Sequence, residues 1–274
     1  MHLERASWFP QAERLRDGQR RRVDHDCGSG RTLLIRRDHD GYHAWCFRCC
    51  LPGFVGPQAE SLEDKLARIN RMLVGDGTVR GVVGDLPLPR VYEVSEWPDG
   101  AAVWLYKAGL GRNDIGRLGI FYHPPSDRVV LPVPGRQGSV FFQARAYQTG
   151  RFPKYLGPDQ RPRDLVPVWG RARSATLCED ILSAMKVGMV GEGWAVLGTS
   201  VSDAMVAALL KRGTPVNVAL DPDPAGRKGA AKICKQLRAY GLNVRDVVMP
   251  RDPKLMPLDY LRRVLVEGED PTDV

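Results

Sequence analysis

The sequence predicts an α/β protein, in which a parallel sheet with flanking helices follows a small α+β region and an N-terminal β-rich module. Three observations support this prediction. After residue 170, short apolar runs alternate with helical patterns, as in a parallel sheet. Between residues 89 and 170, short apolar runs are separated by Pro and Gly turns. Before residue 57, four of the six cysteines gather among short β-type runs.

The composition is that of a globular protein without a membrane-spanning segment. The 274 residues are 43% hydrophobic, which suits one large domain or two modest ones. The longest apolar runs fall far short of the ~20 residues that cross a bilayer. The N-terminus carries no apolar signal segment, so we expect a cytoplasmic protein with no membrane contact. Because the cytoplasm is reducing, clustered cysteines favour a metal site over disulfides.

Residues 1–56 carry the candidate metal ligands. The pair His25 and Cys27 is separated by eighteen residues from the pair Cys46 and Cys49. Four such ligands suit one tetrahedral, structural Zn²⁺. The residues between the pairs read as a hairpin, so this module is predicted to be a zinc ribbon.

The spacing of the first ligand pair leaves open which residues form it. His-x-Cys is tighter than the usual two-residue spacer, so His39, His43 or Cys50 is an alternative ligand. Arginines and aromatic residues nearby suit single-stranded nucleic acid, although at least one ring is expected to serve the ribbon's core. These residues are Arg31, Arg36, Arg37, Arg48, Tyr42, Trp45 and Phe47.

Residues 57–88 are predicted to form a flexible linker. Apolar residues from Leu62 to Leu73 recur at helical spacing, whereas Gly75, Gly77, Gly81 and Gly84 are expected to end that helix.

Residues 89–170 are predicted to form a basic subdomain, with strands at Val129–Val133 and Ser139–Phe142. The net charge of +8 favours a polyanionic partner, and one basic strip stands out. Against the single acid Asp159, this strip contains Arg136, Arg145, Arg151, Lys154, Arg161 and Arg163.

Residues 171–274 show the regular strand and helix alternation. Helices are expected from about 180, 202 and 226. In an open parallel sheet, functional groups lie beyond the carboxyl ends of the strands. The predicted strands are Ala175–Cys178, Ala195–Leu197, Val216–Leu220 and Asn243–Met249.

Acidic residues follow two of these strands. Glu179 follows one strand, and Asp221 and Asp223 follow another, so adjacent strands would bring the three together. Clustered carboxylates without His or Cys suit Mg²⁺ or Mn²⁺. Two alternatives stay open: the two aspartates cap the next helix, or Arg227 or Lys228 neutralises the cluster.

The acidic phrase resembles a motif of the TOPRIM domain of bacterial and bacteriophage primases. Residues 221–228, Asp-Pro-Asp-Pro-Ala-Gly-Arg-Lys, are similar to its phage-primase form. The preceding segment resembles the basic subdomain of those primases in order and spacing. With the N-terminal ribbon, the layout resembles a zinc-binding domain linked to an RNA polymerase domain. The matching phrases are Val129–Val133, Gly138–Val140, Gln143–Arg145, Pro153–Leu156 and Gly170.

The resemblance implies roles for individual residues. Glu179, Asp221 and Asp223 would be catalytic and bind Mg²⁺, and Arg145 and Lys154 would hold nucleotide phosphate or template. Further candidates for cofactor binding are Asp252, from a phrase similar to the family's Lys-Asp-Pro motif, and Lys228. The sequence departs from the family pattern by Asp180 and Ser183 in the first motif and by Lys254 in the last, so we expect an altered second metal position.

By this resemblance the chain is expected to be a DNA primase, which makes RNA primers from NTPs on a single-stranded DNA template. No Walker-type nucleotide-binding loop occurs in the sequence, so we expect any replicative helicase to be a separate polypeptide. If a bacteriophage encodes the chain, we expect it to lie in the cytoplasm of the host. The alternatives are a metal-dependent TOPRIM nuclease and a non-catalytic DNA-binding recombination mediator.

Overall fold

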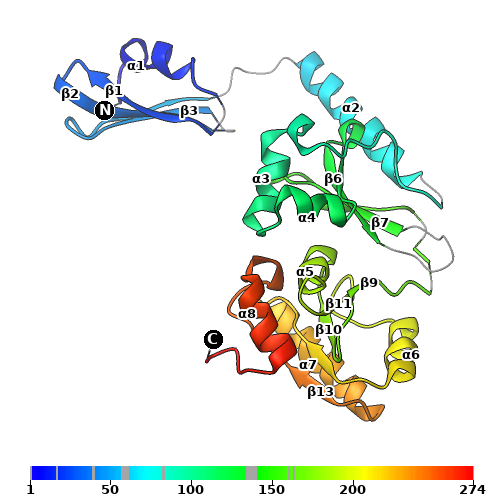
Figure 1. Ribbon diagram of the computed structural model, residues 1–274. Coiled ribbons are helices and arrows are strands. Elements are labelled where there is room, and N and C mark those ends of the chain that lie inside the picture. The colour runs from blue at the N-terminus through cyan, green and yellow to red at the C-terminus, as the bar shows by residue number, and fades with distance from the viewer. Residues whose placement is uncertain are drawn as a thin grey trace. The chain divides into compact units, whose positions relative to one another are not determined.

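The computed structural model describes residues 2–16, 18–38, 41–56, 62–81, 84–133, 141–159, 161, 162 and 164–273, except for the side chains of 62–65, 68 and 71. The chain divides into two compact units, Met1–Asn70 and Arg71–Val274 (Figure 1). Each is described by itself. No helix of the described residues is both long enough and apolar enough to pass through a lipid bilayer.

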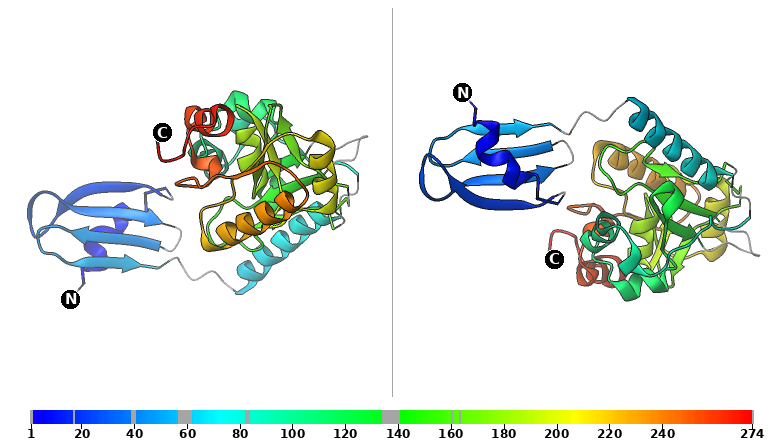
Figure 2. Two further views of the ribbon diagram at one scale, coloured as in Figure 1. Left: turned by 90° about the horizontal axis from the view of Figure 1, so that it is seen from below. Right: turned by 90° about the horizontal axis from the view of Figure 1, so that it is seen from above.

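The first unit is a four-stranded antiparallel sheet in chain order, crossed on one face by a helix (Figure 2). Trp8 of the helix is buried with Leu33 and Ile35 of the sheet. A Cβ at Gly53 would lie 2.7 Å from the Trp8 indole, so glycine lets the helix approach the sheet. The elements are α1 (Arg5–Ala12), β1 (Arg20–His25), β2 (Gly28–Asp38), β3 (Gly41–Cys46) and β4 (Pro52–Val55).

The predicted hairpin is confirmed by the pairing of β2 with β3. Leu33 lies opposite Cys46 and Asp38 lies opposite Gly41. The residues of the turn itself, 39 and 40, lie outside the described residues. The sequence analysis did not predict α1, which covers the inner face of this sheet.

Helix α2 (Leu62–Arg80) is longer than predicted. It continues through Gly75 and Gly77, so the expectation that these glycines end the helix is wrong. A Cβ at Gly75 would lie 1.8 Å from the carbonyl oxygen of Pro125, which shows that this glycine permits close packing. Val79 is buried against Phe121. The end of α2 is therefore part of the second unit's packing and not flexible linker.

The basic region forms an antiparallel sheet in the order β5-β6-β7-β8. Alternate residues of β6 face opposite sides: Val130 packs with Val79 of α2, whereas Val129 and Leu131 belong to the core that includes α3 and α4. Residues 134–140 lie outside the described residues, so of the strand predicted at 139–142 the described part starts at Phe141. The elements are α3 (Asp99–Lys107), α4 (Arg112–Arg117), β5 (Phe121–His123), β6 (Arg128–Val133), β7 (Phe141–Arg145) and β8 (Tyr155–Leu156).

The C-terminal region contains the predicted parallel sheet, in the order β13-β12-β10-β11-β9. Four strands are parallel, and β9 pairs antiparallel with β11 at one edge. The strands are β9 (Val168–Gly170), β10 (Ala175–Cys178), β11 (Glu192–Ala195), β12 (Val216–Val218) and β13 (Val244–Asp246). Strand β10 has the predicted bounds, β11 starts three residues and ends two residues earlier than predicted, and β9 was not predicted.

Helices cover both faces of this sheet. One face packs against α5 (Ile181–Val187) and α8 (Leu258–Arg262), within the same core that includes α3. The other face packs against α6 (Asp203–Arg212) and α7 (Pro224–Ala239). This two-sided burial explains why the strands read as continuous apolar runs.

Candidate metal centre and acidic pocket

The structure brings the four predicted zinc ligands together in the first unit. His25 ends β1, Cys46 ends β3, and Cys27 and Cys49 lie in the turns after these strands. The ligand atoms of the four residues all lie within 4.8 Å of one another. His25 Nδ1 is 3.0 Å from Cys27 Sγ, which is 3.5 Å from Cys46 Sγ. One nitrogen and three sulfur atoms at this spacing fit a tetrahedral Zn²⁺ ion.

The alternative ligands are placed differently. The ring of His43 packs on Phe54, with a centroid distance of 4.9 Å, and Cys50 is exposed with a φ of 56°. His39 lies outside the described residues. Among the described residues, His25, Cys27, Cys46 and Cys49 are the one group of His, Cys or acidic side chains whose ligand atoms lie this close together.

The thiol of Cys46 is prepared for ionisation. Burial disfavours its thiolate, but backbone N–H groups of Cys49 and Arg48 outweigh burial and lower the pKa of Cys46 to about 6. Burial, with hydrogen bonds to Cys46 and Cys49, raises the pKa of Cys27. A bound cation would relieve this competition among neighbouring thiols.

In the second unit, four of the five residues predicted to be catalytic line one cavity of about 400 Å³. Glu179 directly follows β10, and Asp221 lies three residues beyond the end of β12, the parallel neighbour of β10. Arg145 and Lys154 come from β7 and the residue before β8. Glu179 and Asp221 thus line the same cavity, and Asp252 also lines it.

Two of the predicted residues lie at the edge of this arrangement. Asp223 is exposed and is the N-cap of α7, where its Oδ1 accepts from Gly226 N at 2.7 Å. Lys228 is exposed and is not among the residues that line the cavity. The capping alternative therefore describes Asp223 but not Asp221.

Buried carboxylate oxygens mark the acidic end of the cavity. Glu179 Oε2 and Asp221 Oδ1 are buried and have no hydrogen-bond partner. Burial, followed by repulsion from Asp223 and Asp180, raises the pKa of Glu179. Burial likewise raises the pKa of Asp221 to about 6, although Lys254 opposes the shift. Unpartnered hard oxygens of this kind fit a divalent cation.

The internal cation of the cluster is Lys254, and the alternative that Arg227 or Lys228 neutralises it is wrong. Lys254 Nζ lies 2.8 Å from Asp180 Oδ2, 2.7 Å from Asp252 Oδ2 and 3.6 Å from Asp221 Oδ2. Burial would lower the pKa of Lys254, but these carboxylates raise it. Arg227 instead pairs with Asp246 at 2.7 Å, on the neighbouring strand β13.

Arg145 and Lys154 form the basic end. The guanidinium of Arg145 lies 4.9 Å from the ring centroid of Tyr155 and 5.5 Å from that of Trp104. The ammonium of Lys154 lies 5.6 Å from the Tyr155 ring. Aromatic rings hold both cations in place without neutralising them, which leaves their charge available to an anion.

Residues 178–255 match the family Toprim-like. These residues form a Toprim-like domain. Its first matched residue is the last of β10, and its last lies one residue beyond Lys254, so the match contains all the acids of the cavity.

DNA primases are among the proteins that the chain matches. A DNA primase of Staphylococcus aureus is 28% identical over 160 residues, which are 53% of this chain and 26% of that protein. The chain thus spans about a quarter of the relative's length. The zinc-binding and RNA polymerase domains of the Aquifex aeolicus primase align over 93% of this chain and 81% of theirs, at 16% identity and a TM-score of 0.52. The resemblance to primases is confirmed, and the structural likeness is one of fold.

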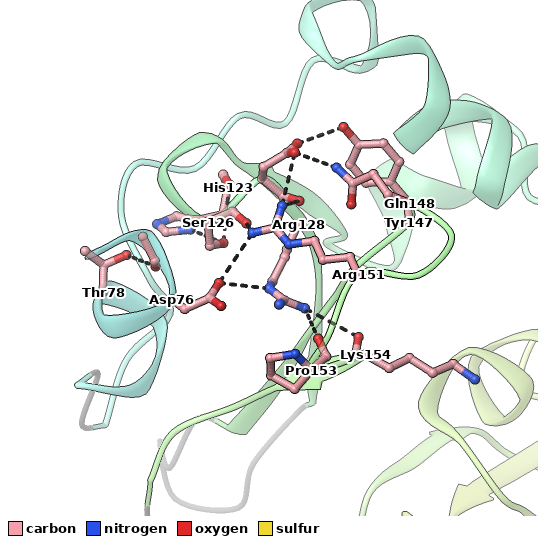
Figure 3. Close-up of polar contacts among 12 residues, drawn as sticks. Asp76, Thr78, His123, Ser126, Arg128, Tyr147, Gln148, Arg151, Pro153 and Lys154 are labelled. Carbon is pink, nitrogen blue, oxygen red and sulfur yellow. Dashed lines mark hydrogen bonds and ion pairs between the residues drawn. The ribbon is translucent and has the colours of Figure 1, made fainter. Parts of the chain in front are cut away.

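A buried polar cluster supports the backbone of Lys154, the residue before β8 (Figure 3). Arg128, which is fully buried, donates to the carbonyl oxygens of Pro153 at 2.8 Å and Lys154 at 3.4 Å. Its Nε lies 3.3 Å from Asp76 of α2. The Lys154 side chain points away from this cluster in Figure 3. Arg128 therefore fixes the backbone of Lys154 and leaves the ammonium free to face the cavity.

The basic strip divides into two kinds of residue. Arg151 belongs to the support, because it pairs with Asp127 at 3.2 Å and Asp76 at 3.5 Å. Arg145 and Lys154 line the cavity. Arg136 and Arg163 lie outside the described residues. Sequence reasoning missed Arg128 and Asp76, which no motif marked, and assigned no pairing to Asp180 and Lys254.

Proposed function

We propose that this chain is a DNA primase that makes short RNA primers from nucleoside triphosphates on single-stranded DNA. The observation that carries the proposal is the presence of both acidic and basic groups in one cavity. Two carboxylate oxygens without a hydrogen-bond partner, of Glu179 and Asp221, share this cavity with Arg145 and Lys154. Primer synthesis needs a cation site for the triphosphate and basic groups for phosphate and template.

Each group of residues has a part in phosphoryl transfer. Glu179 and Asp221, with Asp223 at the rim, would hold Mg²⁺ or Mn²⁺, which polarises phosphate oxygens and offsets the charge of leaving pyrophosphate. Arg145 and Lys154 orient the anionic nucleotide and keep it in line with the 3′ hydroxyl of the preceding one. The hydroxyl would lose its proton to solvent as its oxygen bonds to the α-phosphorus and pyrophosphate leaves, because Glu179 would be committed to the ion.

The His25, Cys27, Cys46 and Cys49 centre would hold a structural Zn²⁺. On the face of the ribbon, Trp45, Phe47 and Phe54 are exposed, and Arg22 lies 4.8 Å from the Phe47 ring centroid. Exposed rings beside arginine suit stacking with unpaired bases. We propose that the ribbon selects the template and that a separate helicase supplies it.

A primer-synthesis assay tests the proposal. The protein is incubated with a random single-stranded DNA pool, labelled NTPs and Mg²⁺, and products are separated on a denaturing gel. We expect short RNA that falls by at least about 100-fold in Asp221→Asn, while Asp203→Asn, an exposed carboxylate at the start of α6, serves as the matched control. Template-dependent RNA that survives Asp221→Asn would refute the assignment.

The same incubation separates the alternatives. A metal-dependent nuclease would shorten the DNA pool and make no RNA. A recombination mediator would bind the DNA and leave it unchanged. Arg145 and Lys154 in the cavity favour the primase over both, because they provide a site for nucleotide phosphate opposite the acids.

A further inference from the structure

Lys254 occupies the space in which three carboxylate oxygens converge. Its Nζ is within 3.6 Å of one oxygen each from Asp180, Asp221 and Asp252. Converging carboxylate oxygens are what a divalent cation would use. Here an ammonium group from the protein itself already holds them.

The ammonium is fixed in position. The Lys254 side chain is only 18% exposed, and its residue lies in a short 3-10 turn, Pro253–Leu255. The backbone carbonyl of Lys254 accepts a hydrogen bond of 2.9 Å from Nζ of Lys186, which is itself buried. Lys186 also donates to the carbonyl of Ala108. Since both its backbone and its ammonium are bonded, Lys254 is not free to leave the acids without breaking several contacts.

The two oxygens of Asp221 have different surroundings. Oδ2 faces Lys254, whereas Oδ1 is buried without a partner, as is Oε2 of Glu179. Asp180 is likewise committed, because Oδ1 accepts from Ser183 N at 2.7 Å and Oδ2 pairs with Lys254. The buried carboxylate oxygens without a partner are therefore those of Glu179 and Asp221.

We propose that Lys254 is a resident cation that takes the place of a second divalent ion, so that this cavity binds one Mg²⁺ or Mn²⁺, through Glu179 and Asp221. The proposal rests on the metal site of the proposed function and sets its stoichiometry. Lys254 holds Asp180, Asp221 and Asp252 together whether or not the divalent ion is present.

Mn²⁺ titration followed by electron paramagnetic resonance tests the proposal on the full chain with its zinc centre loaded. We expect one tightly bound Mn²⁺ per wild-type chain and two in Lys254→Gln, which removes the charge but keeps a long polar side chain. Lys254→Arg, which keeps the charge, should bind one. Lys235→Gln, an exposed lysine of α7, is the matched control and should also bind one.

Each result is decisive. Two tightly bound ions in the wild type, or one in a folded Lys254→Gln variant, would overturn the role of Lys254, and the wild-type count remains informative even if the variant fails to fold. A wild type that binds no Mn²⁺ would overturn the metal-dependent function itself. Thermal unfolding gives a second measure: Mn²⁺ should raise the melting temperature of Lys254→Gln more than that of the wild type.

Discussion

The carboxylate of Asp76 lies 3.3 Å from Nε of Arg128, and this ion pair joins helix α2 to strand β6. Arg128 is fully buried and also donates to the carbonyls of Pro153 and Lys154. The end of α2 is thus bonded, through one guanidinium, to the backbone of a proposed catalytic lysine.

Breaking this pair should destabilise the second unit. Asp76→Asn removes the counter-charge of a buried guanidinium, and we expect a loss of about 3 kcal/mol in the free energy of unfolding, measured with urea. Glu96→Gln, at an exposed carboxylate, should change it by less than about 0.5 kcal/mol. Equal stability of Asp76→Asn and wild type would show that Arg128 does not depend on Asp76.

Replacing one zinc ligand should unfold the ribbon alone. Cys46→Ser removes a buried ligand, so we expect metal content to fall from one zinc per chain to none and the first unit to lose its protection from proteolysis. The second unit should keep its protection from proteolysis. Cys50→Ser is the matched control, because Cys50 is exposed and outside the ligand set. A zinc content unchanged by Cys46→Ser would contradict the site.

Stability without metal should fall as pH rises through the range in which Asp221 ionises. Its folded-state pKa is raised from 3.8 to about 6, so between these values the folded protein binds more protons than the unfolded chain. The contribution is fully present below about pH 4 and is lost as pH rises through about 6, by up to about 3 kcal/mol. Urea unfolding of wild type and Asp221→Asn across this range measures it as the change in their difference.

Mg²⁺ should reduce that loss, because a bound cation favours the ionised carboxylate. A difference between wild type and Asp221→Asn that is constant from pH 4 to 6 in chelator would contradict the raised pKa.

Two glycines in helices should respond oppositely to alanine. A Cβ at Gly226 would lie 2.1 Å from the carbonyl oxygen of Asp221, so Gly226→Ala must push α7 away from the acidic loop. We expect a loss of about 2 kcal/mol and weaker Mn²⁺ binding. Gly77→Ala, with nothing within 4 Å, should stabilise by about 0.5–1 kcal/mol. Calorimetry on both variants checks the pair.

The parts of the site that follow from local order were predictable from sequence. Glu179 and Asp221 each follow a strand, and parallel neighbours end at one edge, so their approach needs only the pairing of β10 with β12. The position of the ligand pair Cys46 and Cys49 is determined by the hairpin of β2 and β3. Both predictions depend on short segments whose geometry is regular.

The parts that depend on tertiary packing were not predictable. Lys254 lies 74 residues from Asp180, and Arg227 was nearer in sequence to the acids, yet Arg227 is taken by Asp246. Gly75 reads as a helix breaker, but its close contact with Pro125 makes glycine favourable there. In both cases a distant contact outweighs the local preference.

Strand β9 has a consequence for dissecting the protein into fragments. It ends eight residues before the first residue of the Toprim-like match and directly at the expected boundary 170/171. It is nevertheless the edge strand of the same sheet. A fragment that starts at residue 171 would leave β11 with unpaired backbone groups along Glu192–Trp194 and remove the buried Trp169. Such an edge invites pairing with other chains. A soluble catalytic fragment should therefore begin upstream of Val168.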